Sequence, residues 1–98
     1  MRIFTKKTIQ EYWKKHPDCE LQLLTWYKVV KHVNWKSFEE IKSVFNSADY
    51  VGNNRVVFNI KGNAYRLVAK FNFEKSWVFV RFIGTHAEYD KIKDIKNI

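Results

Sequence analysis

The sequence predicts one α+β domain over residues 1–98, with an N-terminal strand, two to three helices and a closing helix packed on a mostly antiparallel sheet. In the first half of the chain, apolar residues recur every three or four positions, which is the helical period. Beyond about residue 50 they alternate or run together as in strands. Three Gly and one Pro in 98 residues leave no segment with a linker composition.

The first part of the chain predicts a short strand and then helices. Residues 2–4 can pair as a strand, and Thr5 is placed to cap a helix that begins at Lys6 and stops at His16. Pro17 ends that helix, because the residue before a proline avoids helical dihedrals. Asp18 is then placed to cap a second helix, which ends near residue 31 or 32.

The middle of the chain predicts a third helix and a loop. Ser37 and Glu40 have the spacing of a capping box, which starts a helix over residues 38–45. Residues 46–50 are expected to form a loop, and residues 52–54 a turn.

Beyond Arg55 the residues are β-branched and aromatic and predict an antiparallel meander. Its three strands are expected at residues 55–60, 65–73 and 77–83. Thr85 and Glu88 have the spacing of another capping box, so a closing helix is expected from His86 to about Ile95.

Alternation along the second of these strands separates a core face from an opposite face. The set expected to face the core is Tyr65, Leu67, Ala69 and Phe71. The set expected to face solvent or a polyanion is Arg66, Val68, Lys70 and Asn72.

The chain is strongly basic, with 18 Lys and Arg against 10 Asp and Glu and a net charge of +8. The meander holds a single acid, Glu74, and six basic side chains: Arg55, Lys61, Arg66, Lys70, Lys75 and Arg81. This excess favours a polyanionic partner, and nucleic acid is the commonest one. A surface that is charged only for solubility is the alternative.

Several chemistries and locations are not expected. Cys19 is the only cysteine, so neither an internal disulfide nor a Cys/His metal site is predicted. No apolar run approaches the roughly 20 residues of a membrane span. The sequence also lacks a phosphate-binding loop and a dinucleotide-binding glycine pattern. We therefore expect a cytoplasmic protein without membrane contact, metal or cofactor.

The densest group of reactive side chains lies in residues 84–90. His86 exchanges protons near neutral pH, and Tyr89 is expected on the same side of the predicted helix. A phosphate held where the strand ends and the helix begins would meet both side chains, and Arg66 across the sheet. By itself the pattern is weak, since a histidine at a helix start is more often a simple surface residue.

Two motifs give the chain a resemblance to a known family. They are NIKGNAYRLVAKF, from Asn59, and GTHAEYDKI, from Gly84. With the preceding helices, they are similar to the HigB toxins of the RelE-like group. The resemblance implies a toxin of a type II toxin–antitoxin system that cleaves mRNA on the ribosome. It also implies a HigA-like helix-turn-helix antitoxin as partner.

The resemblance further implies site residues. The strand arginine that contacts the scissile phosphate corresponds to Arg66, the residue just after the last strand to His86, and the following tyrosine to Tyr89. The chain departs from RelE at Asn59, where RelE has a lysine, and after Thr85, where RelE is arginine-rich. Further contacts to RNA are predicted at Lys61, Asn63, Lys70 and Arg81.

Cleavage of RNA by its own 2′-OH needs a group that takes the hydroxyl proton, one that holds negative charge and one that protonates the leaving 5′-oxygen. Arg66 suits the second role because a guanidinium fork matches phosphate oxygens. His86 suits proton transfer, and Tyr89 orients the substrate or assists. Two alternatives stay open: a non-catalytic RNA- or DNA-binding module, and a protein-interaction domain. Candidate contacts to a protein partner are Val29, Val33 and Trp35.

Overall fold

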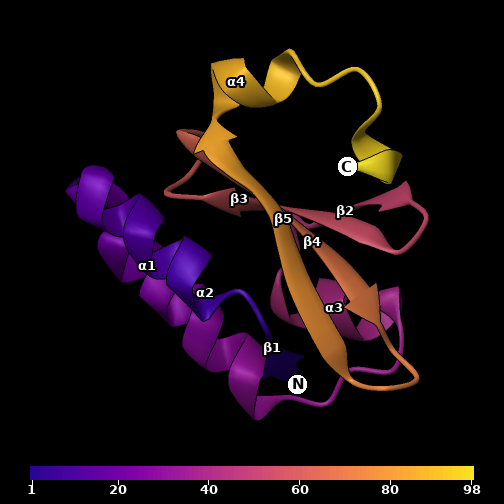
Figure 1. The fold of residues 1–98 in the computed structure, drawn as a ribbon. Coiled ribbons are helices and arrows are strands. Elements are labelled where there is room, and N and C mark those ends of the chain that lie inside the picture. Colours follow the sequence, from indigo (N-terminus) through magenta and orange to yellow (C-terminus); the bar gives the residue numbers. More distant parts are fainter.

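The computed structural model describes all of residues 1–98, which form one five-stranded sheet with helices on both sides (Figure 1). The strand order is β1-β5-β4-β3-β2, with β1 parallel to β5 and every other neighbouring pair antiparallel. The strands are β1 (Arg2–Ile3), β2 (Asp49–Gly52), β3 (Arg55–Ile60), β4 (Tyr65–Asn72) and β5 (Trp77–Thr85). The predicted α+β class, with a mostly antiparallel sheet, is confirmed.

The helices divide between the two sides of the sheet (Figure 1). On one side lie α1 (Lys6–Lys15), α2 (Glu20–His32) and α3 (Phe38–Val44), with the short 3₁₀ turn η1 (Pro17–Cys19) between the first two. On the other side lie α4 (His86–Asp90) and the 3₁₀ turn η2 (Ile95–Asn97). We call the second side the open face. The strand residues that point toward it include Asp49, Arg55, Val57, Asn59, Arg66, Val68, Lys70, Asn72, Trp77, Phe79, Phe82 and Gly84.

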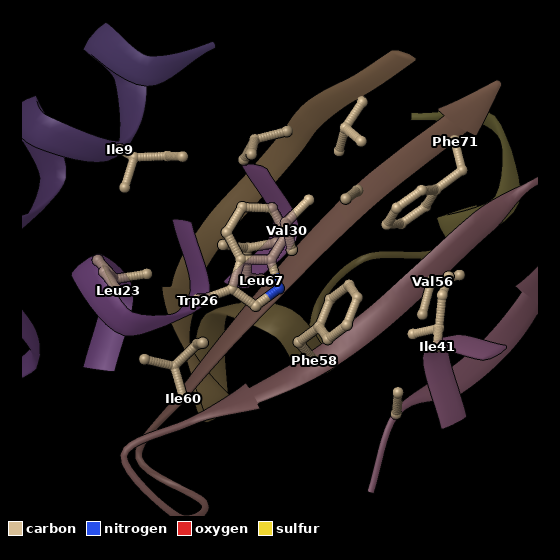
Figure 2. Packing of buried hydrophobic residues seen from close by; sticks show 14 of the residues in the cluster. Ile9, Leu23, Trp26, Val30, Ile41, Val56, Phe58, Ile60, Leu67 and Phe71 are labelled. Atoms are coloured by element: carbon tan, nitrogen blue, oxygen red, sulfur yellow. The ribbon is translucent and has the colours of Figure 1, made fainter. Parts of the chain in front are cut away.

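The main core lies between the sheet and α1–α3 (Figure 2). Trp26 of α2 meets Phe58 of β3 edge to face, with 5.4 Å between the ring centroids. Seventeen buried residues form this cluster. It includes the four residues of β4 that alternation assigns to the core, Tyr65, Leu67, Ala69 and Phe71. Because an aromatic side chain buries a large apolar area, these contacts hold the helices against the strands that carry the basic residues.

The predicted loop over residues 46–50 is wrong at its end, because Asp49–Gly52 forms the edge strand β2. Its register places Asp49 opposite Val57 and Tyr50 opposite Val56. The segment has no apolar alternation, and the backbone pairing with β3 makes it a strand. The following turn is as predicted: Asn53 and Asn54 both adopt positive φ, 50° and 62°.

Three of the predicted helix caps are absent. The Thr5 and Asp18 side chains bind other partners, and Ser37 makes no cap hydrogen bond. The Thr5 hydroxyl accepts a hydrogen bond from the Val80 N–H, at 2.9 Å. The Asp18 carboxylate accepts one from the Tyr65 hydroxyl. Only the capping box at the start of α4 is confirmed.

The predicted closing helix over residues 86–95 is too long, since α4 ends at Asp90. Residues 91–98, which we call the C-terminal segment, continue from α4 toward β2 (Figure 1). There the Asn53 side-chain amide donates to the Lys96 carbonyl, at 3.2 Å. Contacts to strands far away in the sequence therefore determine its path.

The apolar positions expected to meet a protein partner are not available as predicted. Trp35 is 5% exposed, belongs to the core and lies 6.2 Å from Phe71 between ring centroids. Val29 and Val33 are half-buried and pack against the same cluster. They stabilise the fold, so they are poor candidates for a docking surface.

Candidate active site

The strand register brings basic and polar residues into rows across the open face. Arg66 on β4 lies between Asn59 on β3 and Gly84 on β5. Four residues further along the strand, Lys70 lies opposite Arg55. Between the two rows the face is apolar and covered: Val57 is 4% exposed and Val68 is fully buried, although neither belongs to the main core. The prediction that Val68 would meet solvent is therefore wrong.

Arg66 lies at the end of the open face nearest α4. Its Nη1 donates to the main-chain oxygens of Tyr65, at 3.3 Å, and of Asn63, at 3.5 Å. No carboxylate lies within 4 Å of the guanidinium. Main-chain carbonyls therefore hold the Arg66 guanidinium in place, and no carboxylate neutralises its charge, so it can bind an anion.

Tyr89 of α4 lies beside this guanidinium. The Arg66 Cζ is 5.9 Å from the centre of the Tyr89 ring, and the centroids of the Phe82 and Tyr89 rings are 6.4 Å apart. Burial raises the pKa of Tyr89, although the Arg66 charge acts in the opposite direction. The phenol is therefore protonated near neutral pH, which suits it to donate a hydrogen bond or a proton.

The start of α4 is held in place by local hydrogen bonds. The Glu88 N–H donates to the Thr85 hydroxyl, at 3.2 Å, and the Thr85 N–H donates to the Glu88 carboxylate, at 2.8 Å. These bonds lower the pKa of Glu88. Gly84 leaves room for the Phe82 ring and the Glu88 carboxylate, since a Cβ there would lie 2.5 Å from the end of that ring and 3.1 Å from Glu88 Oε1.

His86 is the first residue of α4 and is fixed at two points. Its N–H donates to the Ala64 carbonyl in the β3–β4 turn, at 3.1 Å. Its ring Nδ1 lies 2.8 Å from the Asp90 carboxylate, one helical turn on. A carboxylate on Nδ1 leaves Nε2 as the ring nitrogen free for a substrate. The sequence analysis missed Asp90, although the spacing of four from His86 could have revealed it.

Lys61 is engaged on the other side of the sheet. Its ammonium lies 3.1 Å from the Asp18 carboxylate, which also accepts from the Tyr65 hydroxyl at 2.8 Å. The hydrogen bond from Tyr65, and then that from Lys61, lowers the pKa of Asp18. The same bond raises the pKa of Tyr65 to about 12. This network ties the β3–β4 turn to η1, and Lys61 is not among the groups that surround Arg66.

We expect the Asp18 network to make the protein less stable in acid. A carboxyl group whose pKa is lowered by folding stabilises the fold above its unfolded-state pKa, and this contribution is lost as the pH falls through the folded-state value. Urea unfolding at neutral pH should therefore show Asp18→Asn less stable than the wild type, and the difference should shrink below about pH 4. Glu20→Gln, which removes an exposed carboxylate without an ion pair, is the control. A difference that does not change with pH would contradict the assignment.

The other predicted RNA contacts lie at different places. Lys70 is exposed on the open face, and Asn63 is exposed in the β3–β4 turn. Arg81 is the extra residue of a bulge in β5, where the pairing shifts between Val68 and Ala69, and its Nε donates to the Ile98 main-chain oxygen at 3.1 Å. Arg66 and Tyr89 are thus brought together beside the helix that carries His86, whereas Lys61, Lys70 and Arg81 lie apart from them.

No three His, Cys, Asp or Glu side chains gather as a metal-binding group. No helix combines the length and the apolar character needed to span a bilayer. The site is a basic sheet end with a protonated phenol and an imidazole–carboxylate pair, equipped for an anionic substrate and proton transfer. The α+β fold that carries this site is consistent with the fold of RelE-like toxins.

Comparisons with known proteins show the family of the chain. A family model described as HigB_toxin, the RelE-like toxic component of a toxin–antitoxin system, matches residues 19–92, and the chain belongs to this family. The mRNA interferase HigB of Escherichia coli O6:H1 (strain CFT073) is 34% identical over 94 residues, which cover 94% of this chain and 91% of the relative. The mRNA interferase toxin HigB of E. coli K12 is 32% identical over 93 residues, covering 92% and 88%.

Proposed function

We propose that the chain is the mRNA-cleaving toxin of a type II toxin–antitoxin system and that residues 1–98 act as one toxin domain. The family and the names of the relatives, mRNA interferase, support endoribonuclease activity. The observation that carries the assignment to this face is the position of Arg66. Its guanidinium has no carboxylate partner and lies 5.9 Å from Tyr89, beside the helix that begins with the His86–Asp90 pair.

The proposed reaction is attack of the 2′-OH on its own 3′-phosphodiester. His86 takes the hydroxyl proton through Nε2, because Nδ1 is bound to Asp90. Arg66 holds the negative charge that builds up on the phosphate oxygens. Tyr89, whose pKa is raised, supplies a hydrogen bond or a proton at the leaving 5′-oxygen. The bond from phosphorus to the 5′-oxygen breaks, leaving a 2′,3′-cyclic phosphate and a 5′-hydroxyl end.

The RNA strand is proposed to follow the open face beyond the site. Lys70 and Arg81 lie along it, while Asn63 and Lys61 lie in or next to the β3–β4 turn. Lys61 would contact a phosphate only by exchanging its Asp18 partner. Such contacts position the strand and add affinity that falls with salt.

We further propose that the substrate is mRNA on the ribosome, and hence that the protein acts in the cytoplasm. The names of the relatives, mRNA interferase HigB, support mRNA as the target, and the resemblance to the HigB toxins implies the ribosome. The partner that silences the toxin is proposed to be a HigA-like helix-turn-helix protein. Copurification of the toxin with the product of an adjacent reading frame tests that partner.

Ribosome dependence is tested by comparing two substrates. The purified protein should cut a reporter mRNA slowly when the RNA is free and rapidly in a translating extract, with mapped 5′ ends that carry a hydroxyl. Addition of an inhibitor that blocks initiation should suppress the cleavage. Equal cutting of free and translated RNA would refute the dependence, and no cleaved ends in either setting would refute the nuclease.

A further inference from the structure

Two guanidinium groups converge on one oxygen atom at the far end of the open face. Arg55 donates to the main-chain oxygen of Ile98 through Nε, at 3.3 Å, and through Nη2, at 2.8 Å. Arg81 donates to the same oxygen through Nε, at 3.1 Å. The third polar contact of Arg55 is the Asn53 carbonyl, at 2.9 Å from Nη1. We call these two side chains the arginine pair.

The arginine pair has hydrogen-bond partners but no acidic side chain to balance its charge. Arg55 is only 6% exposed, and it is the one buried charged residue of the chain. None of the ion pairs includes Arg55 or Arg81, so no Asp or Glu oxygen lies within 4 Å of either guanidinium. Burying a charge is costly unless an opposite charge accompanies it. Two such cations aimed at one oxygen therefore make a site that favours an anion.

The arginine pair and Arg66 lie on the same face of the sheet. On β3, Arg55 is four residues from Asn59, the partner of Arg66, and an even spacing keeps side chains on one face. Four residues of strand correspond to about 13 Å. Phosphates recur every few ångström along a nucleic-acid strand, so a strand a few nucleotides long reaches from one site to the other.

We propose that Arg55 and Arg81 form a second phosphate-binding subsite, which holds a backbone phosphate of the RNA strand a few nucleotides away from the bond at Arg66. The Ile98 main-chain oxygen occupies this subsite in the free protein, so RNA and the C-terminal segment compete for it. The proposal rests on the proposed function, because it takes the ligand to be the RNA that is cleaved. It adds Arg55, which the sequence analysis did not assign to any site.

The C-terminal segment is suited to be displaced. It meets the arginine pair through a single oxygen atom of Ile98, whereas the phosphodiester group of RNA offers two charged oxygens to the same donors. Elsewhere the segment is held by the Asn53 amide, which donates to the Lys96 carbonyl at 3.2 Å and lies 3.4 Å from the Asn97 side-chain oxygen. Lys91, Lys93 and Lys96 are exposed, so displacement adds positive charge close to the strand.

The test measures binding of fluorescein-labelled 2′-O-methyl RNA, which has no free 2′-OH and is not cut. A dinucleotide reaches only Arg66, and an octanucleotide reaches both sites. Arg55→Gln and Arg81→Gln should each weaken octanucleotide binding roughly tenfold and reduce the salt dependence of log K by about 0.7. Binding of the dinucleotide should not change. Lys14→Gln removes one charge on the exposed side of α1 and is the matched control.

Release of the C-terminal segment should have the opposite effect. Deletion of residues 95–98 should tighten octanucleotide binding and leave the dinucleotide unaffected. Asn53→Gly loosens the same segment, keeps the positive φ of this position and guards against a deletion that unfolds the protein. Thermal unfolding of each variant verifies that it is folded.

The outcomes separate the inference from the proposed function. The subsite would be overturned if Arg55→Gln and Arg81→Gln bound the octanucleotide as tightly as Lys14→Gln does. It would also be overturned if the two variants lost equal affinity for the dinucleotide and the octanucleotide. Unchanged binding by both the deletion and Asn53→Gly would overturn the competition. The proposed function fails on a different result, the absence of new mRNA ends when the unaltered protein acts in a translating extract.

Discussion

Replacing Arg66 with alanine should lower the rate of mRNA cleavage by roughly 10²–10³-fold, the loss found when one donor to a developing negative charge is removed. Its guanidinium has no carboxylate partner and is held by the Tyr65 and Asn63 carbonyls, so it is already aimed and charged before the substrate arrives. The measurement is the rate at which new 5′ ends form on a reporter mRNA in a translating extract.

Two variants sharpen this result. Arg66→Lys keeps the charge but loses the planar fork, so it should recover only part of the rate. Lys14→Ala on α1 should cleave like the wild type, since Lys14 is exposed and its helix lies on the other side of the sheet. Full cleavage by a folded Arg66→Ala protein would remove Arg66 from the reaction.

Replacing His86 with alanine should cost roughly 10²–10⁴-fold in the same assay, the usual contribution of a positioned acid or base. The loss should appear as well in cells, where expression of the variant without an antitoxin should no longer arrest growth. Since the His86 side chain is exposed and its N–H bond to Ala64 is a backbone contact, the melting temperature should change little.

His86→Ala also separates a nuclease from a module that only binds RNA. Binding of 2′-O-methyl RNA should persist in the variant, because the imidazole is proposed to move a proton rather than to hold the strand. Growth arrest by His86→Ala as strong as that by the wild type would contradict the role of His86. Arrest by both proteins without any cleaved transcript would favour the non-catalytic alternative.

The helices and the meander could be predicted because their signals are local. Ile9, Leu23 and Ile41 lie on apolar faces with helical spacing, and all three are buried in the core. The box formed by Thr85 and Glu88 is also complete within four residues, and it starts α4 where predicted. Such features depend on neighbours along the chain, which the sequence shows directly.

The failures concern side chains and segments whose partners are far away in the sequence. Thr5 was expected to cap a helix, but its hydroxyl binds the Val80 N–H on β5. β2 has no strand pattern of its own and forms because β3 supplies the hydrogen bonds. Trp35 follows a helix and looked available for contact, but it packs beside Phe71 in the core.

By itself the sequence determined the fold class, the basic character of the meander, the membership of Arg66 and Lys70 in one strand face, and the family. Tertiary structure alone decided which of these residues meet. It placed Tyr89 beside Arg66 and paired Lys61 with Asp18, away from Arg66. It also brought Arg55 and Arg81 to a single oxygen of Ile98. The reason is physical: periodicity sets the direction of a side chain from its own strand or helix, whereas contacts between elements depend on register, bulges and the path of the chain, which arise only when the whole sheet forms.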